Sequence, residues 1–412
     1  MLAALVESGD IMSQTPFLTR LHLKHFRSLR NVTVTFDNPL ILVGKNGSGK
    51  SNFVDALAFL SECVQRPLST LIQERGGVYA LCTRGPAGYS PSYLKVRADF
   101  ELPGKRMRHG HYAFFLATQT DADLSVMQEQ CFIMEGGERV AWFHRDGKKF
   151  RASVEGFRPA FDAQSLALPI MGGLEEFAPA FKALASMRVY SFAPDRIRQQ
   201  REPDGGKELK RDGSNVASVL LRHFNRNPGY LRRVGELLAP IVPGITTVLP
   251  RLQNNRIDLV LSQSVNVGEA TQLDFDISEM SDGTIYALAL IVATMQEPAP
   301  SLMVIEEPEA MIHPGAMDAI AEKIALAARR SQVIVTTHST DLLDTKWIEA
   351  KHLRLVEWEN GQTHISPLGS LPVRALQQHL MGAGELLRAN ALIAAPISPQ
   401  EEIPELFDET PA

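Results

Sequence analysis

The order of apolar and polar residues near the start of the chain predicts strands followed by a helix. Apolar and polar positions alternate over residues 17–27 and 32–36, a period typical of half-buried strands. Residues 39–43 form a short apolar run that leads to a glycine, and residues 51–63 have the spacing of a helix. We therefore expect two β-segments that lead into a buried strand, a glycine-rich loop and a helix.

The last part of the chain repeats short apolar runs typical of buried strands, separated by stretches of helical length. The strands are expected at 245–262, 302–305, 332–337, 353–358 and 364–367, and the helices at 281–296 and 316–329. Such alternation predicts an α/β fold, in which a mostly parallel or mixed sheet is flanked by helices on both faces. The sheet would be split in the sequence, with its start at 40–63 and its remainder at 245–360.

Everything between these two parts is expected to be insertion. Residues 65–172 alternate as strands do and are punctuated by glycines, which predicts a β-rich lobe. The pattern of residues 173–244 is mostly helical, and no heptad repeat is sustained that would predict a long coiled coil. The predicted organisation is a first part of the head at 1–64, the β-rich lobe at 65–172, the helical insert at 173–244, a second part of the head at 245–395 and an acidic tail at 396–412.

The composition is that of a globular protein in a reducing compartment. The chain has 412 residues, of which 44% are hydrophobic and 22% charged. Its three cysteines, Cys63, Cys82 and Cys131, are odd in number and far apart, which argues against a disulfide scaffold or a cysteine-rich zinc site. No apolar run of about 18 residues is present, so we expect no membrane-spanning helix and a cytoplasmic location.

The loop after the first buried strand predicts a phosphate-binding site. Residues 44–51 read GKNGSGKS, which satisfies G-x-x-x-x-G-K-[ST] in the strand–loop–helix context that this pattern needs. Glycines allow the backbone N–H groups to point at phosphate oxygens, and the helix start adds a positive dipole end. Lys50 is expected to reach the β- and γ-phosphates of ATP, and the Ser51 hydroxyl to ligate Mg²⁺. The residues expected to contact the nucleotide are Gly44, Lys45, Asn46, Gly47, Ser48, Gly49, Lys50, Ser51 and Asn52. A glycine-rich surface loop is the alternative, against which the context argues.

Two neighbouring acids end the apolar run at 302–305. A carboxylate at the tip of a strand beside the phosphate loop can hold Mg²⁺, and a second one can orient or deprotonate the attacking water. We assign Glu306 to the metal and Glu307 to the water. The alternative is a cluster of acids that caps a helix.

A histidine ends the apolar run at 332–337. A polar side chain at this place can contact the γ-phosphate and report its presence. We therefore expect His338 to take part in the reaction with Lys50 and Glu307. The alternative is a histidine with a purely structural role.

The sequence MSDGT at residues 280–284 precedes a predicted helix. The N–H groups at the start of that helix and the Ser281 hydroxyl could bind a phosphate. Because the site of Lys50 already has a phosphate cradle, this second one is most useful when it comes from another subunit. Simple capping of the helix by Ser281 is the alternative.

In this order the motifs resemble those of ABC-type ATPases of the RecF, Rad50 and SMC branch. The segments that carry the resemblance are 26–29 (FRSL), 44–51, 280–284, 305–309 and 337–341. The chain is most similar to short prokaryotic AAA-like ATPases of the overcoming-lysogenisation-defect and Septu type, over 1–64 and 245–395. The resemblance implies a head-to-tail homodimer in which each ATP lies between the phosphate loop of one chain and Ser281 with Gly283 of the other. It also implies a nucleotide contact for Arg27.

The chain departs from the family pattern in three respects. MSDGT differs from the LSGGQ of transporters, which argues against a transporter motor. The glutamine loop of the family has only Gln199 and Gln200 as candidates. Related nucleases carry an acidic Toprim domain after the ATPase, and about 70 residues follow His338. We therefore do not expect nuclease activity in this chain.

Charge is unevenly distributed along the chain. The net charge is −5, yet residues 188–233 contain eleven Lys or Arg against five Asp or Glu. This segment could contact DNA phosphates without reading sequence, or it could be a solvated helical face. The first hypothesis is therefore an ATP-driven dimeric switch that acts on DNA in repair or anti-phage defence. The second is an ATP-sensing scaffold that controls a separate effector, a toxin or a nuclease, without binding DNA.

Overall fold

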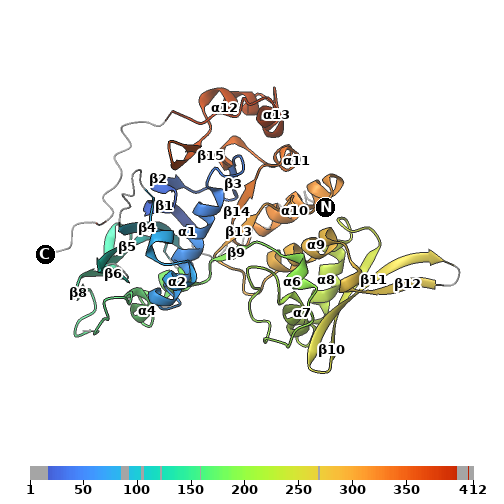
Figure 1. Ribbon diagram of the computed structural model, residues 1–412, viewed down its shortest axis with the longest axis horizontal. Helices are drawn as coiled ribbons and strands as arrows, with labels where there is room; N and C mark the ends of the chain where they lie inside the picture. The colour runs from blue at the N-terminus through green and yellow to red at the C-terminus, as the bar shows by residue number, and fades with distance from the viewer. Residues whose placement is uncertain are drawn as a thin grey trace.

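The computed structural model describes residues 17–84, 92–103, 106–120, 123–157, 159–267, 270–396 and 407. Within these ranges the strands form three sheets of seven, six and three strands. Figure 1 shows the seven-stranded sheet at one side of the molecule and the three-stranded sheet at the other, with the six-stranded sheet between them.

The six-stranded sheet carries the P-loop strand. Its order is β16-β15-β3-β14-β13-β9. β16 pairs antiparallel with β15, and the other neighbours are parallel. The strands are β16 (Gln362–Pro367), β15 (Leu353–Glu359), β3 (Leu40–Val43), β14 (Gln332–Thr337), β13 (Leu302–Glu306) and β9 (Arg188–Tyr190). Short, continuous apolar runs suit strands that are buried on both faces. The predicted α/β fold with a largely parallel sheet is therefore confirmed.

Helices cover both faces of this sheet. They are α1 (Lys50–Cys63), α9 (Asp282–Thr294), α10 (Met317–Ala327), α11 (Thr340–Leu343), α12 (Ser370–Gln377) and α13 (Ala383–Arg388). Alternate residues of β13 belong to different cores: Val304 packs in the core that contains α1, whereas Met303 and Ile305 pack with α9 and α10. This alternation follows from the period of two along a strand. Short 3₁₀ helices occur at Ile277–Glu279, Pro314–Ala316 and Ala350–His352.

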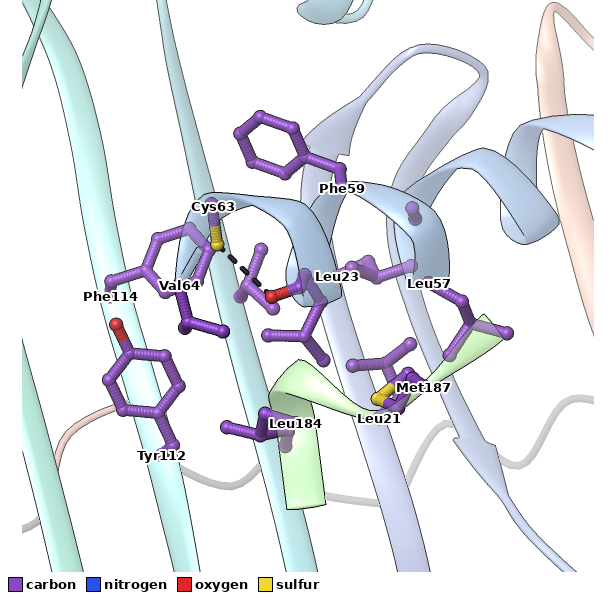
Figure 2. Packing of buried hydrophobic residues seen from close by; sticks show 14 of the residues in the cluster. Leu21, Leu23, Leu57, Phe59, Cys63, Val64, Tyr112, Phe114, Leu184 and Met187 are labelled. Carbon is purple, nitrogen blue, oxygen red and sulfur yellow. Dashed lines mark hydrogen bonds between the residues drawn. The ribbon is translucent and has the colours of Figure 1, made fainter. Parts of the chain in front are cut away.

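The seven-stranded sheet is antiparallel and runs in the order β2-β1-β4-β5-β6-β7-β8. Its strands are β1 (Phe17–Phe26), β2 (Leu29–Thr35), β4 (Tyr93–Leu102), β5 (Arg108–Thr120), β6 (Asp123–Glu135), β7 (Glu138–Asp146) and β8 (Lys149–Ala152). Four helices accompany it: α2 (Leu68–Glu74), α3 (Val78–Leu81), α4 (Leu168–Met171) and α5 (Ala178–Ala185). Figure 2 shows side chains of β1, β5, α1 and α5 in one core.

This arrangement differs from the separate β-rich lobe expected at residues 65–172. β4 pairs with β1 along nearly its whole length, so the strands on the two sides of residue 64 share one sheet. The pairing satisfies the backbone of β1 that would otherwise form an open sheet edge. Alternation along a strand predicts that a strand exists but does not identify its partner.

The remaining elements form a lobe beside β9. They are α6 (Pro194–Ile197), α7 (Val216–Phe224), α8 (Pro228–Leu238), β10 (Ile245–Gln253), β11 (Arg256–Val267) and β12 (Ala270–Asp276). Contrary to expectation, β10 to β12 form their own antiparallel sheet, and β9 from the supposed helical insert joins the parallel one. Asn254 and Asn255 both have positive φ, at 48° and 59°, which makes the tight hairpin turn that commits β10 and β11 to antiparallel pairing.

The seven-stranded sheet contains a wholly buried carboxyl group, that of Glu129 on β6. Its oxygens accept hydrogen bonds from Ala167 N (2.6 Å), Leu168 N (2.9 Å) and the Tyr112 hydroxyl (2.9 Å). Burial raises its pKa to about 7. Between pH ~4.5 and ~7 the folded protein therefore holds a proton that the unfolded chain has lost, and this group's contribution to stability falls as pH rises.

We predict that Glu129→Gln removes this pH dependence. The wild-type free energy of unfolding, relative to that of the variant, should fall by about 3 kcal/mol from pH 4.5 to pH 8, at about 1.4 kcal/mol for each unit of pKa shift. Urea unfolding of both proteins across this range measures the difference. A difference that stays constant with pH would contradict the prediction.

Candidate functional site

The P-loop joins β3 to α1 in the conformation that its glycines permit. Gly47 and Gly49 have φ of 79° and 103°, in the left-handed region that favours glycine. The Lys50 ammonium donates to the carbonyls of Gly44 (2.7 Å) and Lys45 (3.1 Å). Burial lowers the pKa of Lys50, and the carboxylates of Glu307 and Glu309 oppose that shift.

The loop has the features that a bound triphosphate requires. The Ser48 hydroxyl is buried and has no hydrogen-bond partner. α1 has no side-chain cap and no acid in its first turn, so its first N–H groups are free to bind an anion. Ser51 is exposed at the start of this helix, where its hydroxyl can meet a metal ion beside the phosphates. These residues therefore fit ATP with Mg²⁺.

A threonine from the opposite end of the chain supports the loop. Thr363 on β16 is almost fully buried, and its hydroxyl donates to the Ser48 carbonyl (3.0 Å). The same hydroxyl lies 2.7 Å from the Ser28 hydroxyl, which also accepts from the Asn52 amide (2.6 Å). The predicted site residue Asn52 thus faces this network. Sequence reasoning gave no role to Ser28 or Thr363, since the contact to Thr363 spans more than 300 residues.

We predict that Thr363→Val weakens nucleotide binding because it keeps the side-chain volume and removes the hydroxyl. Losing one or two hydrogen bonds of ordinary strength should lower ATP affinity about threefold to tenfold. Titration of the protein with a fluorescent ATP analogue measures the effect. Thr345→Val is the matched control, because Thr345 is also buried but its hydroxyl bonds to the Leu342 carbonyl. Equal affinities of the two variants would contradict the prediction.

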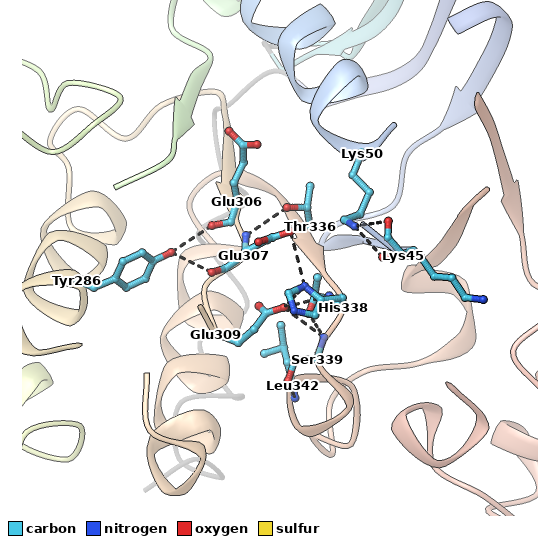
Figure 3. A network of polar contacts seen from close by, with 12 residues as sticks. Lys45, Lys50, Tyr286, Glu306, Glu307, Glu309, Thr336, His338, Ser339 and Leu342 are labelled. Atoms are coloured by element: carbon cyan, nitrogen blue, oxygen red, sulfur yellow. Dashed lines mark hydrogen bonds and ion pairs between the residues drawn. The ribbon is translucent and has the colours of Figure 1, made fainter. Parts of the chain in front are cut away.

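The acids and the histidine meet at the carboxyl ends of β13 and β14. Glu307 follows β13 with a positive φ of 44°. Its carboxylate lies 3.6 Å from Nδ1 of His338, and so does that of Glu309. Figure 3 shows these three side chains close together on the side of Lys50. The structure therefore brings together the three predicted catalytic residues Lys50, Glu307 and His338.

Glu309 was quoted in the motif but was given no role. It is nearly buried and accepts hydrogen bonds from the Thr337 hydroxyl (2.6 Å) and the backbone N–H groups of His338 (3.0 Å) and Ser339 (3.2 Å). Its other oxygen is buried without a partner. Glu309 thus fixes the turn that carries His338.

One expectation about strand order was wrong. β13, which carries the acids, does not lie beside the P-loop strand, because β14 pairs with both β3 and β13. His338 is therefore on the neighbouring strand, and the acids are one strand further away. The hydrophobic pattern does not encode the order of parallel strands, so the sequence could not show this.

Glu306 ends β13, as expected, but its carboxylate pairs with Arg211 at 3.0 Å. Among the described residues, no group of three or more His, Cys, Asp or Glu side chains forms a metal-binding cluster. Mg²⁺ beside phosphates commonly needs only one or two carboxylates from the protein. A metal contact of Glu306 therefore stays a prediction.

Ser281 and Gly283 lie at the start of α9. The Ser281 hydroxyl accepts from Thr284 N at 3.2 Å, so Ser281 is the N-cap of this helix. A Cβ on Gly283 would lie 2.6 Å from the Met311 carbonyl, so this close approach requires glycine. Within one chain the capping role is thus present, and a phosphate contact of Ser281 and Gly283 stays a prediction.

The remaining predicted residues have partners within the chain. The Arg27 guanidinium pairs with Asp55 of α1 at 3.0 Å, and its nucleotide contact stays a prediction. Gln200 donates to Asp258 on β11 (2.7 Å), while Gln199 accepts from Arg201 (2.8 Å). Neither glutamine makes a described contact with the P-loop.

Solved structures share this architecture. An SMC head bound to the C-winged helix domain of ScpA matches with a TM-score of 0.54 at 16% identity, over 85% of this chain and 97% of that one. The Smc head with an extended coiled coil from Pyrococcus furiosus, bound to the C-terminal domain of ScpA, matches with a TM-score of 0.55 at 14% identity, over 89% and 99%. The fold is therefore that of an SMC head.

Sequence comparisons support the same class. The family described as "AAA domain, putative AbiEii toxin, Type IV TA system" matches residues 148–344, and one described as "AAA domain" matches residues 20–61. These matches include the P-loop, the start of α9 and the strands that carry the acids and His338. In fold and in these sequence matches, the chain resembles ABC-type ATPases of the RecF and SMC type.

Particular relatives extend the likeness. The Old nuclease of Escherichia phage P2 is 24% identical over 352 residues, which cover 80% of this chain and 57% of that protein. The "Retron Ec83 probable ATPase" of Escherichia coli is 22% identical over 408 residues, covering 85% and 72%. A DNA replication and repair protein RecF of Synechococcus sp. is 44% identical over 54 residues, 13% of this chain and 14% of that protein. The resemblance predicted from the motifs is confirmed, although the chain spans little more than half of the Old nuclease.

No helix in the described ranges is long and apolar enough to cross a membrane.

Proposed function

We propose that this chain binds and hydrolyses ATP as a head-to-tail homodimer and works as a nucleotide-driven switch. The observation that carries the proposal is the position of Glu307, which lies beside His338 and acts electrostatically on Lys50. A γ-phosphate held by Lys50 would therefore have a carboxylate within reach on the side from which water can attack.

Each residue has a role that follows from its chemistry. The P-loop N–H groups and Lys50 bind the phosphates, while Ser51 and Glu306 hold the Mg²⁺ that neutralises charge on them. Glu307 orients the attacking water and takes its proton. His338, 3.6 Å from Glu307, contacts the γ-phosphate and positions that carboxylate.

The exposed start of α9 supports the proposed dimer. Ser281 is exposed and lies on a helix other than α1, so it can act on a phosphate bound by a second chain. The shared ATP then joins the two chains, and hydrolysis separates them.

We predict that Ser281→Asp prevents ATP-dependent dimerisation but leaves ATP binding by the single chain within about twofold. Aspartate also caps helices, so α9 keeps its stability, while its charge repels the partner's phosphates. Ser281→Asn is the matched control, because it keeps the cap without the charge. Sedimentation with ATP should show at least about tenfold weaker association for the aspartate variant. Equal association of the two variants would contradict a phosphate contact at Ser281.

DNA is the first candidate for what the switch acts on, as the RecF likeness favours. A specific observation favours the second candidate, a scaffold for a separate effector protein. Of the eleven basic side chains in residues 188–233, six form ion pairs with acids. These pairs reduce the positive surface that phosphates would meet.

Salt dependence separates the two candidates. DNA binding predicts that the logarithm of the affinity falls linearly with the logarithm of the salt concentration, and that the affinity weakens when Arg226 and Arg232 are both replaced by alanine. These two side chains are exposed. Anisotropy of labelled duplex DNA, with ATP and Mg²⁺ present, measures this. Absence of binding at low salt would favour the effector scaffold.

A further inference from the structure

The geometry points to an inhibitory ion pair between Arg211 and Glu306, in which Arg211 binds the carboxylate that would otherwise hold the metal. The inference rests on the proposed function and adds a means of regulation to the same site. Arg211 lies on the segment before α7, outside the motifs at 44–51, 280–284, 305–309 and 337–341.

The contact is direct and engages the relevant group. Nη2 of Arg211 lies 3.0 Å from Oε1 of Glu306, whose side chain is only 15% exposed. In Figure 3 the Glu306 side chain points away from His338 and Glu309. The ion pair therefore holds Glu306 apart from the residues that lie beside Lys50.

Arg211 has space to move when it is displaced. Together with α1 and β9, its segment lines a cavity of about 710 Å³. Arg211 is one of the residues that line this cavity, and 46% of its side chain is exposed. It can leave Glu306 without repacking of the core.

The segment of Arg211 is also connected to the start of α9. Asp212 accepts from Arg196 of α6 at 3.1 Å. Arg198, two residues after Arg196, donates to the Met280 carbonyl (2.8 Å) and pairs with Asp282. Met280 and Asp282 flank Ser281. A movement of Arg211 away from Glu306 would therefore be transmitted through these contacts to the surface that is proposed to face a second chain.

The exposure of the Arg211 side chain sets how strongly the ion pair can oppose Mg²⁺ binding. A half-exposed ion pair contributes little, so a metal ion with its nucleotide can displace it. We expect the pair to raise the Mg²⁺ concentration that half-saturates nucleotide binding by about twofold to fivefold.

The test compares Arg211→Gln with Lys207→Gln. Lys207 is exposed on the same segment and has no ion pair among the described residues, so its variant removes the same charge without touching Glu306. With a fluorescent, non-hydrolysable ATP analogue, Arg211→Gln should lower the half-saturating Mg²⁺ concentration about twofold to fivefold, and Lys207→Gln should leave it unchanged. Hydrogen exchange at residues 280–284 without nucleotide should rise only in Arg211→Gln. Equal Mg²⁺ requirements in the two variants would overturn the inference.

A ligand-free measurement separates this inference from the proposed function. Thermal unfolding of wild type, Arg211→Gln, Glu306→Gln and the double variant forms a cycle that isolates the pair. The two substitutions should be non-additive. Additive effects would overturn the ion pair whether or not the protein binds ATP. Failure of the wild type to bind ATP, with the two substitutions still non-additive, would overturn the proposed function and leave the ion pair standing.

Discussion

Glu307→Gln is expected to lower ATP turnover at least about 100-fold while ATP still binds, because a positioned general base contributes about 10²–10⁴-fold. Glutamine keeps the length and shape of the side chain but cannot take a proton from water. The bound nucleotide should therefore persist, and the protein should accumulate as an ATP-bound dimer. Phosphate release and sedimentation with ATP measure the two effects.

The control for this variant is Glu322→Gln, an exposed position on α10 that has no contact with the site. It should turn over ATP at the wild-type rate. Turnover by Glu307→Gln at a rate near that of this control would mean that another group activates the water.

Lys50→Met should reduce ATP affinity about 100-fold, the second largest effect that we expect. The ammonium is the positive side chain of the P-loop that is fixed inside the turn, through its bonds to Gly44 and Lys45. Hydrogen bonds to charged groups contribute about 1.5–3 kcal/mol each, and a triphosphate would make more than one. Methionine keeps the apolar stem, so folding should be little affected.

Titration with a fluorescent ATP analogue measures this loss, and thermal unfolding without nucleotide shows whether the variant is folded. Lys351→Met, on the exposed surface before β15, should bind ATP normally. If Lys50→Met bound ATP as well as this control, the P-loop assignment would fail.

The parts of the site that the sequence predicted are those set by local chemistry. Residues 44–51 form the predicted loop because glycine alone accommodates positive φ easily, as at Gly47 and Gly49. α9 begins at Asp282 because the Ser281 hydroxyl caps it. Each of these signals lies within a few residues of the structure that it determines.

The parts that the sequence did not predict depend on pairing between distant segments. Nothing in the pattern of β4 shows that it pairs with β1, and nothing in β14 shows that it lies between β3 and β13. Thr363 and Arg211 carry no motif, and each reaches the site only after the sheets have assembled. Local patterns therefore predicted the glycine-rich loop and the start of α9 but not the long-range contacts of Thr363 and Arg211.

The most direct measurement is an experimental structure of Glu307→Gln with ATP and Mg²⁺. We predict the β- and γ-phosphates at the Lys50 ammonium, and residue 307 about 3 Å from a water that faces the γ-phosphate. Ser281 of the partner subunit should lie on the opposite side of the nucleotide. Nucleotide bound elsewhere, or residue 307 turned away from the γ-phosphate, would contradict the account.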